Sequence, residues 1–130
     1  MAHYLDTSAL VKLVVAEAET DALRAWIGAA SSPLVSCDLA RAELLRAVRR
    51  SATERVLQAR AVLDSITLFA VTAATFESAG RLDPTILRTL DAVHVAAALE
   101  LGDDLASIVT YDERLAAAAQ ANGIAVTAPT

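Results

Sequence analysis

The sequence is short of cysteine, aromatic residues and lysine, and these shortages exclude several kinds of protein. Its 130 residues include a single cysteine, Cys37, which rules out an internal disulfide framework and a Cys-x-x-Cys metal site. A reducing compartment, the cytoplasm, is therefore expected. Aromatic residues make up 4% of the chain, whereas hydrophobic residues, many of them alanine, make up 55%. This profile favours closely packed helices against a small sheet.

Long apolar runs are also missing. No segment approaches the roughly 18 consecutive apolar residues of a transmembrane helix, so we expect no membrane span. The first residues lack the basic region that opens a secretory signal, so none is expected. The length is typical of one domain, and we predict a single domain over 1–130. A net charge of −5 argues against a protein that coats nucleic acid.

Short apolar runs alternate along the chain with longer helical stretches. The runs are short and continuous, as expected for strands buried on both faces of a parallel sheet. We therefore predict the α/β class. The predicted strands are 3–5, 34–36, 68–70, 107–110 and 124–126, and the predicted helices are about 8–18, 20–30, 39–65 in two pieces, 73–82, a run ending near 101, and 113–122.

The positions of the acidic residues relative to the strands indicate a functional edge. In parallel α/β sheets, ligands bind beyond the carboxyl ends of the strands. Asp6 directly follows the first predicted strand and Asp112 closely follows the fourth. Asp103 and Asp104 precede that fourth strand and are expected at the opposite edge. Asp6 and Asp112 are therefore candidate site residues.

Two further acids lie in helical segments next to apolar residues. Glu43 borders the apolar face of its helix, and Asp91 is surrounded by Leu, Val and Ala, so we expect it to be mostly buried. Isolated buried carboxylates are costly and need a donor, a cation or a metal. The only lysine is Lys12, and most arginines cluster between 41 and 60, away from three of the four acids in sequence. A hard divalent ion such as Mg²⁺ or Mn²⁺ would balance these carboxylates.

Each acid also has an ordinary structural explanation. The two strand-end acids could cap the helices that follow them. Asp91 could simply favour the start of a helix. Glu43 could pair with Arg46 or Arg50 on its own helix. The acids are more informative together, because all four are expected to face one edge of the sheet.

Four sequence motifs resemble one known family over the whole length of the chain. They are "YLDTSALVKLVVAE", "SCDLARAELLRAVRR", "LRTLDAVHVAAALELG" and "IVTYDERLAAAAQANGI", and they occur in the family's order. Each contains one of the four acids. The chain resembles the PIN domain family, and more closely the VapC toxins of bacterial toxin–antitoxin pairs.

The resemblance implies a fold, an activity and partners. The fold would be a three-layer α/β/α sandwich with a parallel five-stranded sheet in the order 3-2-1-4-5. The activity would be endonucleolytic cleavage of structured RNA such as tRNA or rRNA, with one or two Mg²⁺ or Mn²⁺ ions. A VapB-type antitoxin would neutralise it, and the protein would form a homodimer. The implied metal and catalytic acids are Asp6, Glu43, Asp91 and Asp112, with Ser8 and Thr110 as supporting hydroxyls.

The arginines are the candidate contacts for RNA. Between 41 and 60, six arginines face two acidic residues, and phosphate contacts supply most of the sequence-independent affinity for nucleic acid. The candidates are Arg46, Arg49, Arg50 and Arg88. A solvated helix face is an open alternative for the first three, and Arg88 and Arg114 could instead pair with carboxylates. His94 follows Asp91 by one turn, and we expect it to be packed in the core and not to act as a base.

Three other kinds of function remain to be compared with a nuclease. A DxD phosphatase needs an acid two residues after the first one, but that position is Ser8. A phospho-receiver needs a lysine late in the chain, and the only lysine is Lys12. Both are disfavoured. A non-catalytic binding or regulatory module on the same fold remains an alternative, because intact acids do not prove turnover.

Overall fold

The computed structural model describes all residues, 1–130, and contains a five-stranded parallel sheet in the order β3-β2-β1-β4-β5. β1 is central and pairs with β2 on one side and β4 on the other. The predicted class, the parallel sheet and its order are therefore confirmed. The strands are β1 (Ala2–Leu5), β2 (Leu34–Cys37), β3 (Thr67–Phe69), β4 (Leu105–Val109) and β5 (Val126–Thr127).

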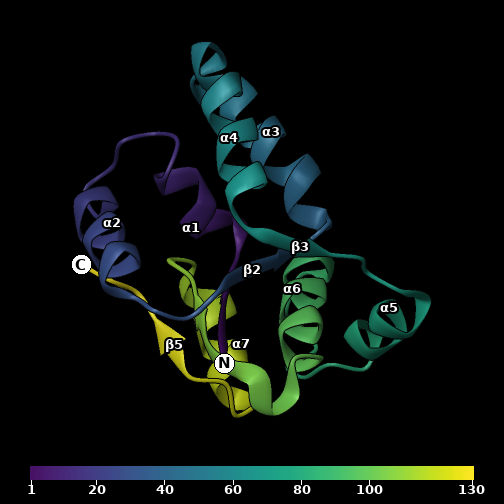
Figure 1. Ribbon diagram of the computed structural model, residues 1–130. Helices are drawn as coiled ribbons and strands as arrows, with labels where there is room; N and C mark the ends of the chain where they lie inside the picture. The colour runs from purple at the N-terminus through teal and green to yellow at the C-terminus, as the bar shows by residue number, and fades with distance from the viewer.

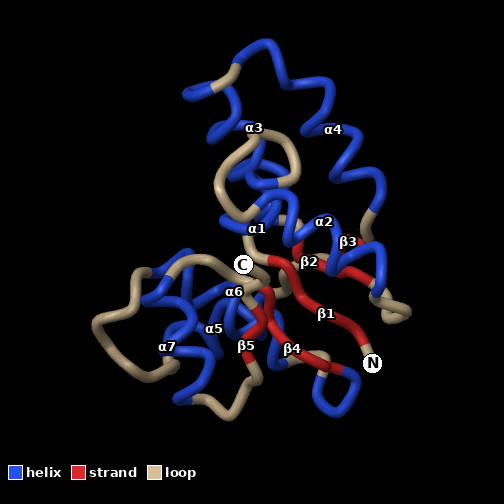
Figure 2. Tube along the Cα trace, turned by 90° about the vertical axis from the view of Figure 1, so that its left-hand side faces the viewer, coloured by secondary structure: helices blue, strands red, loops and turns tan.

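Helices cover both faces of the sheet, which gives the predicted three layers (Figures 1 and 2). α5, α6 and α7 lie on one side. α1 to α4 lie on the other, where α3 and α4 extend well beyond the sheet. The helices are α1 (Thr7–Lys12), α2 (Thr20–Ala29), α3 (Leu39–Ser51), α4 (Val56–Ser65), α5 (Ala73–Gly80), α6 (Thr89–Leu99) and α7 (Glu113–Ala121), with short 3₁₀ turns η1 (Thr53–Arg55) and η2 (Gly102–Asp104).

Two apolar cores form where the helices meet the sheet. One contains Tyr4 and Ile108 from the sheet and buried alanines and valines of α6 and α7. The other contains Leu5 and Val109 from the sheet, packed against leucines of α1 to α4 such as Leu44. Because neighbouring side chains on a strand point to opposite faces, Tyr4 and Leu5 contribute to different cores. The central strand is thereby fixed in register up to Asp6.

The first helix is shorter than predicted. A helix to residue 18 was expected, but α1 ends at Lys12. There, the Thr20 hydroxyl donates to the Lys12 carbonyl at 2.8 Å, and the Lys12 ammonium lies 2.8 Å from Glu19. Residues at the start of α2 thus supply hydrogen-bond partners to Lys12, the last residue of α1, and the chain turns between the two helices. No glycine or proline marks this stop in the sequence.

Candidate metal-dependent nuclease site

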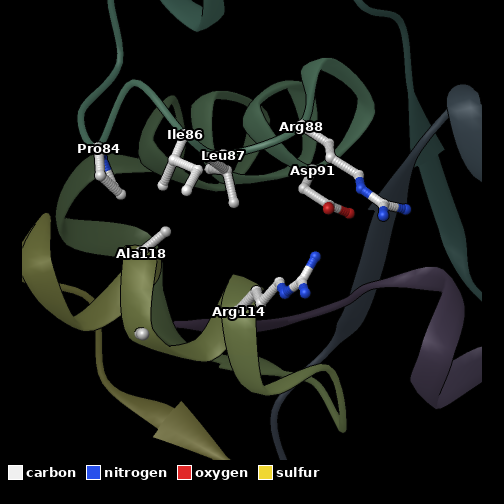
Figure 3. Close-up of a pocket in the computed structure, with 8 residues that line it drawn as sticks. Pro84, Ile86, Leu87, Arg88, Asp91, Arg114 and Ala118 are labelled. Carbon is white, nitrogen blue, oxygen red and sulfur yellow. The ribbon is translucent and has the colours of Figure 1, made fainter.

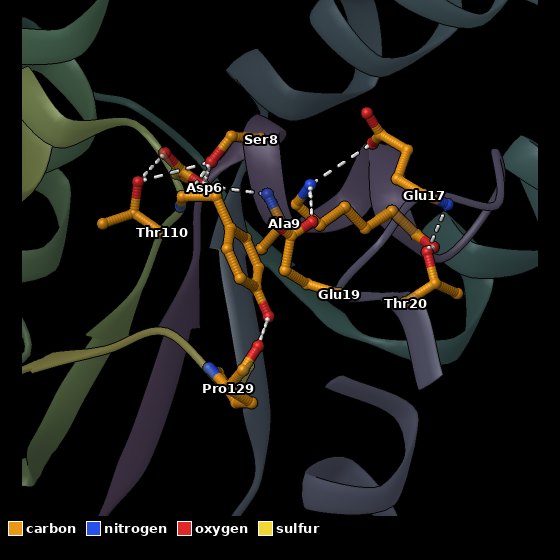
Figure 4. A network of polar contacts seen from close by, with 10 residues as sticks. Asp6, Ser8, Ala9, Glu17, Glu19, Thr20, Thr110 and Pro129 are labelled. Atoms are coloured by element: carbon orange, nitrogen blue, oxygen red, sulfur yellow. Dashed lines mark hydrogen bonds and ion pairs between the residues drawn. The ribbon is translucent and has the colours of Figure 1, made fainter. Parts of the chain in front are cut away.

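Asp6 lies at the carboxyl end of the central strand and is 3% exposed. The Ser8 hydroxyl and the Ala9 amide donate to its Oδ1 at 2.7 and 3.1 Å, and the Thr110 hydroxyl donates to Oδ2 at 2.6 Å (Figure 4). Burial is the largest influence and raises the pKa of Asp6, while these donors oppose the rise. Asp6 caps α1, as the structural explanation of this acid predicted. It also accepts from Thr110, which follows β4, so its contacts go beyond those of a helix cap.

Ser8 and Thr110 tie the start of α1, which follows β1, to the loop that follows β4. Their hydroxyl oxygens lie 3.3 Å apart. The Tyr111 amide donates to Ser8 at 2.9 Å, and the Asp112 amide donates to Thr110 at 3.1 Å. The same two hydroxyls therefore orient Asp6 and position the backbone that carries Asp112. Their expected supporting role matches this geometry, although their part in catalysis stays a prediction.

Glu43, on α3, makes a contact that the sequence did not reveal. Its Oε1 accepts from the Thr7 hydroxyl at 2.8 Å and from His94 Nε2 at 2.6 Å. The His94 side chain is 2% exposed, and its Nδ1 lies 2.7 Å from the Tyr4 hydroxyl. The alternative in which Glu43 pairs with an arginine of its own helix is therefore wrong. Only the helical spacing of His94 from Asp91 hinted that it would lie near the site.

The contacts of the buried pair determine its charge state. Burial lowers the pKa of His94, but hydrogen bonds with Cys37 and Glu43 and the Glu43 charge raise it to about 10. Burial raises the pKa of Glu43, but the hydrogen bond and charge of His94 bring it below its ordinary value of 4.5. The raised pKa of His94 and the lowered pKa of Glu43 together favour an imidazolium–carboxylate pair. His94 is packed in the core, as expected, and holds one oxygen of a candidate acid.

Asp91 and Asp112 complete the acidic edge. Asp91 lies in the first turn of α6 and is of intermediate burial, so most of it is covered, as expected. Burial raises its pKa, and the charges of Asp112 and Glu43 raise it further. Asp112 caps α7 and accepts from the Arg114 and Leu115 amides at 2.9 and 3.1 Å. The Asp91 carboxylate, by contrast, has no hydrogen-bond or ion-pair partner within the protein.

The donor set suits a hard divalent cation in its chemistry. Carboxylate oxygens are the ligands that Mg²⁺ and Mn²⁺ prefer. The pKa of Asp91 is raised first by burial and then by the Asp112 charge, and a bound cation would offset both effects. No group of three or more His, Cys, Asp or Glu side chains is arranged so as to hold a metal ion by itself. The acids therefore suit such a cation by their chemistry, although their side chains as placed do not enclose one.

The predicted RNA-contacting arginines are free of carboxylate partners. Arg46, Arg49 and Arg50, here called the α3 arginine cluster, are exposed, line a hollow of about 210 Å³ and take part in no ion pair. Arg88 and Arg114 also lack ion pairs, so the alternative in which they pair with carboxylates is not observed. Arg41 is the only arginine that forms an ion pair; its partner is Asp38, at 2.9 Å.

Comparison with known proteins defines the family of this chain. The family model for the PIN domain matches residues 3–121. The chain belongs to the PIN domain family. It is 45% identical to ribonuclease VapC46 and 38% identical to ribonuclease VapC47, both of Mycobacterium tuberculosis, over 96–98% of each chain. The resemblance to VapC ribonucleases seen in the four motifs is thus confirmed.

Solved PIN-domain structures have the same fold at low sequence identity. VapC20 of Mycobacterium tuberculosis, a toxin that cleaves the sarcin–ricin loop, superposes with a TM-score of 0.76 at 18% identity, covering 89% of this chain and 94% of that one. VapBC2 of Rickettsia felis, bound to a DNA fragment from its promoter, gives a TM-score of 0.73 at 16% identity over the full length of both chains. The helices of this PIN domain include none that could cross a membrane.

Proposed function

We propose that this PIN domain is a metal-dependent endoribonuclease toxin that hydrolyses phosphodiester bonds of structured RNA. The observation that carries the proposal is the convergence of acids at one sheet edge. Thr110, from the end of β4, donates to Asp6, from the end of β1, and the Asp112 charge acts on Asp91. The ribonuclease names of relatives up to 45% identical support the same reaction class.

Asp6, Asp91 and Asp112 would hold one or two Mg²⁺ or Mn²⁺ ions, with Glu43 beside them. Such an ion lowers the pKa of water and stabilises charge on a phosphoryl group. Ser8 and Thr110 keep both oxygens of Asp6 fixed, and His94 and Thr7 hold one oxygen of Glu43. The carboxylates thus meet the substrate already oriented, which is how second-layer hydrogen bonds support metal sites.

The proposed reaction adds one water across a phosphodiester bond. The water oxygen bonds to phosphorus, the bond from phosphorus to the 3′ oxygen breaks, and a proton passes to that oxygen. The products carry a 5′-phosphate and a 3′-hydroxyl. The α3 arginine cluster and Arg88 would bind RNA phosphates, since unpaired guanidinium groups give a local positive surface on an acidic protein.

The assembly and location of the protein form part of the same proposal. Solved relatives with this fold include toxin–antitoxin complexes, and on this basis we assign a VapB-type antitoxin as the natural inhibitor. The active form would be a homodimer of the single domain, residues 1–130, working in the cytoplasm.

Cleavage of total bacterial RNA tests the proposal. Antitoxin-free protein and Mn²⁺ should give discrete new 5′-phosphate ends, and a chelator or Asp91→Asn should abolish them. Asp104→Asn is the matched control, because Asp104 is an exposed acid before β4, at the opposite edge. Ends that persist in Asp91→Asn would contradict the assigned role of this acid. A wild type that neither cuts RNA nor binds Mn²⁺ would favour a non-catalytic binding or regulatory module.

A further inference from the structure

A pocket of about 370 Å³ opens between the start of α6 and the first turns of α7, beside Asp91 (Figure 3). Its volume falls in the range of about 300–1,000 Å³ typical of small-molecule sites. The eight lining residues are Pro84, Ile86, Leu87, Arg88, Asp91, Arg114, Ala117 and Ala118. Asp91 is the only one of the four motif acids that lines the pocket. The pocket therefore adjoins the acidic edge but is not the same site.

The pocket has one charged end and one apolar end. Arg88 and Arg114 extend from opposite walls toward the Asp91 carboxylate, and neither forms an ion pair. The other end is walled by Pro84 and Leu87 and by Ile86, whose side chain is 88% exposed. This polarity predicts a ligand with an anionic group joined to a flat or apolar one.

The α7 wall leaves room for such a ligand because it consists of alanines. Ala118 faces the loop that carries Ile86 and Leu87 (Figure 3), and Ala117 also lines the pocket; each side chain is a single methyl group. Arginine guanidinium planes also stack on nucleobases and bind phosphates through paired N–H groups. A pocket with two free arginines at its mouth and aliphatic walls is therefore complementary to one nucleotide.

We propose that this pocket is a nucleotide subsite for the RNA substrate, in which Arg88 and Arg114 bind a phosphate and the aliphatic wall receives one unstacked base. The inference rests on the proposed nuclease function and goes beyond it by assigning where a base next to the cleaved bond is bound. Extruding a base costs least in loops and single strands. The subsite thus selects RNA in which a nucleotide can leave the stack.

Filling the pocket tests its role without touching the acids. Ala117→Phe places a ring in the pocket from an exposed position of α7. Ala121→Phe makes the same change at an exposed position of the same helix that does not line the pocket. Both variants should keep the wild-type unfolding midpoint and Mn²⁺ affinity. Cleavage by Ala117→Phe should slow by at least about 10-fold, the smallest effect expected of a single methylene group in an apolar pocket, while Ala121→Phe should cut normally.

Nucleotide binding is measured separately, by amide chemical shifts of the ¹⁵N-labelled protein. Ribonucleoside 5′-monophosphates should shift the signals of Leu87, Arg114 and Ala118 in the wild type and in Ala121→Phe, but not in Ala117→Phe. Inorganic phosphate should shift only the arginine-end signals. Equal shifts with phosphate alone would overturn the assignment of a base subsite.

The two readouts separate this inference from the nuclease proposal. RNA cleavage without nucleotide-dependent shifts, or with equal rates in both phenylalanine variants, would overturn the subsite and leave the nuclease standing. An apolar side chain of a partner protein would then be the occupant to consider. Nucleotide-dependent shifts in a protein that neither cuts RNA nor binds Mn²⁺ would overturn the nuclease and leave only a nucleotide-binding pocket.

Discussion

The buried pair of Glu43 and His94 predicts a large and pH-dependent loss of stability on Glu43→Gln. The substitution keeps the side-chain shape but removes the counter-charge of a histidine that is 2% exposed. Removing one partner of a buried ion pair costs about 3–5 kcal/mol. Glu43 is 23% exposed, and loss of its charge also relieves its repulsion of Asp91. We therefore expect the lower end of the range, about 3 kcal/mol near pH 6.

The pH dependence follows from the direction of each pKa change. The pKa of His94 is raised from 6.5 to about 10, so the stabilisation that it provides is fully present below pH 6.5 and is lost as the pH rises through about 10. The pKa of Glu43 is lowered, so its contribution is lost only in acid, below the ordinary 4.5. The destabilisation caused by Glu43→Gln should thus shrink steadily between about pH 7 and pH 10.

Urea unfolding in the presence of a chelator measures this loss without interference from metal. Glu77→Gln is the control, since Glu77 is an exposed acid of α5 without an ion-pair partner, and it should stay within about 0.5 kcal/mol of the wild type. In a His94→Gln background, Glu43→Gln should have little further effect. A loss of equal size at every pH, or one that persists without His94, would refute the ion pair.

Three further predictions concern the site, the core and the basic surface. Thr110→Val removes a donor to Asp6 and should weaken Mn²⁺ binding by about 10- to 100-fold in calorimetry, whereas Thr67→Val, at an exposed site of β3, should not. Leu44→Ala should cost about 2–5 kcal/mol in urea unfolding, against about 0.5 kcal/mol or less for the exposed Leu57→Ala. Replacing the α3 arginine cluster with glutamine should weaken RNA binding and flatten its salt dependence, by a slope of about 0.7–0.9 per lost phosphate contact; an unchanged slope would exclude phosphate contacts there.

Most of the fold could be predicted because its signals are local. Strands buried on both faces appear as short apolar runs, and all five predicted runs overlap observed strands. The strand order came from the family resemblance and not from the periodicity. The end of the first helix could not be predicted, because it depends on Thr20 and Glu19 of the next helix contacting Lys12. Such tertiary contacts leave no pattern within the segment that they terminate.

The site was only partly predictable for the same reason. Asp6 and Asp112 could be placed from their positions after β1 and β4, since carboxyl ends of parallel strands share one edge. The sequence did not reveal the partner of Glu43, because His94 lies 51 positions away in the chain and the arginines on its own helix are closer in sequence.

The four acids divide into two that the protein satisfies and two that it leaves open. Asp6 is held by two hydroxyls and an amide, and Glu43 by a hydroxyl and an imidazolium. Asp91 has no partner, and Asp112 uses one oxygen to cap α7. Burial raises the pKa of both Asp6 and Asp91, but the donors around Asp6 oppose the rise, whereas at Asp91 the Asp112 charge adds to it. Natural proteins accept such local destabilisation mainly where function requires it. The Asp91 carboxylate, which lies between the acidic edge and the pocket of Arg88 and Arg114 and has no ion-pair partner, is thus the strongest physical indication of where the proposed reaction would take place.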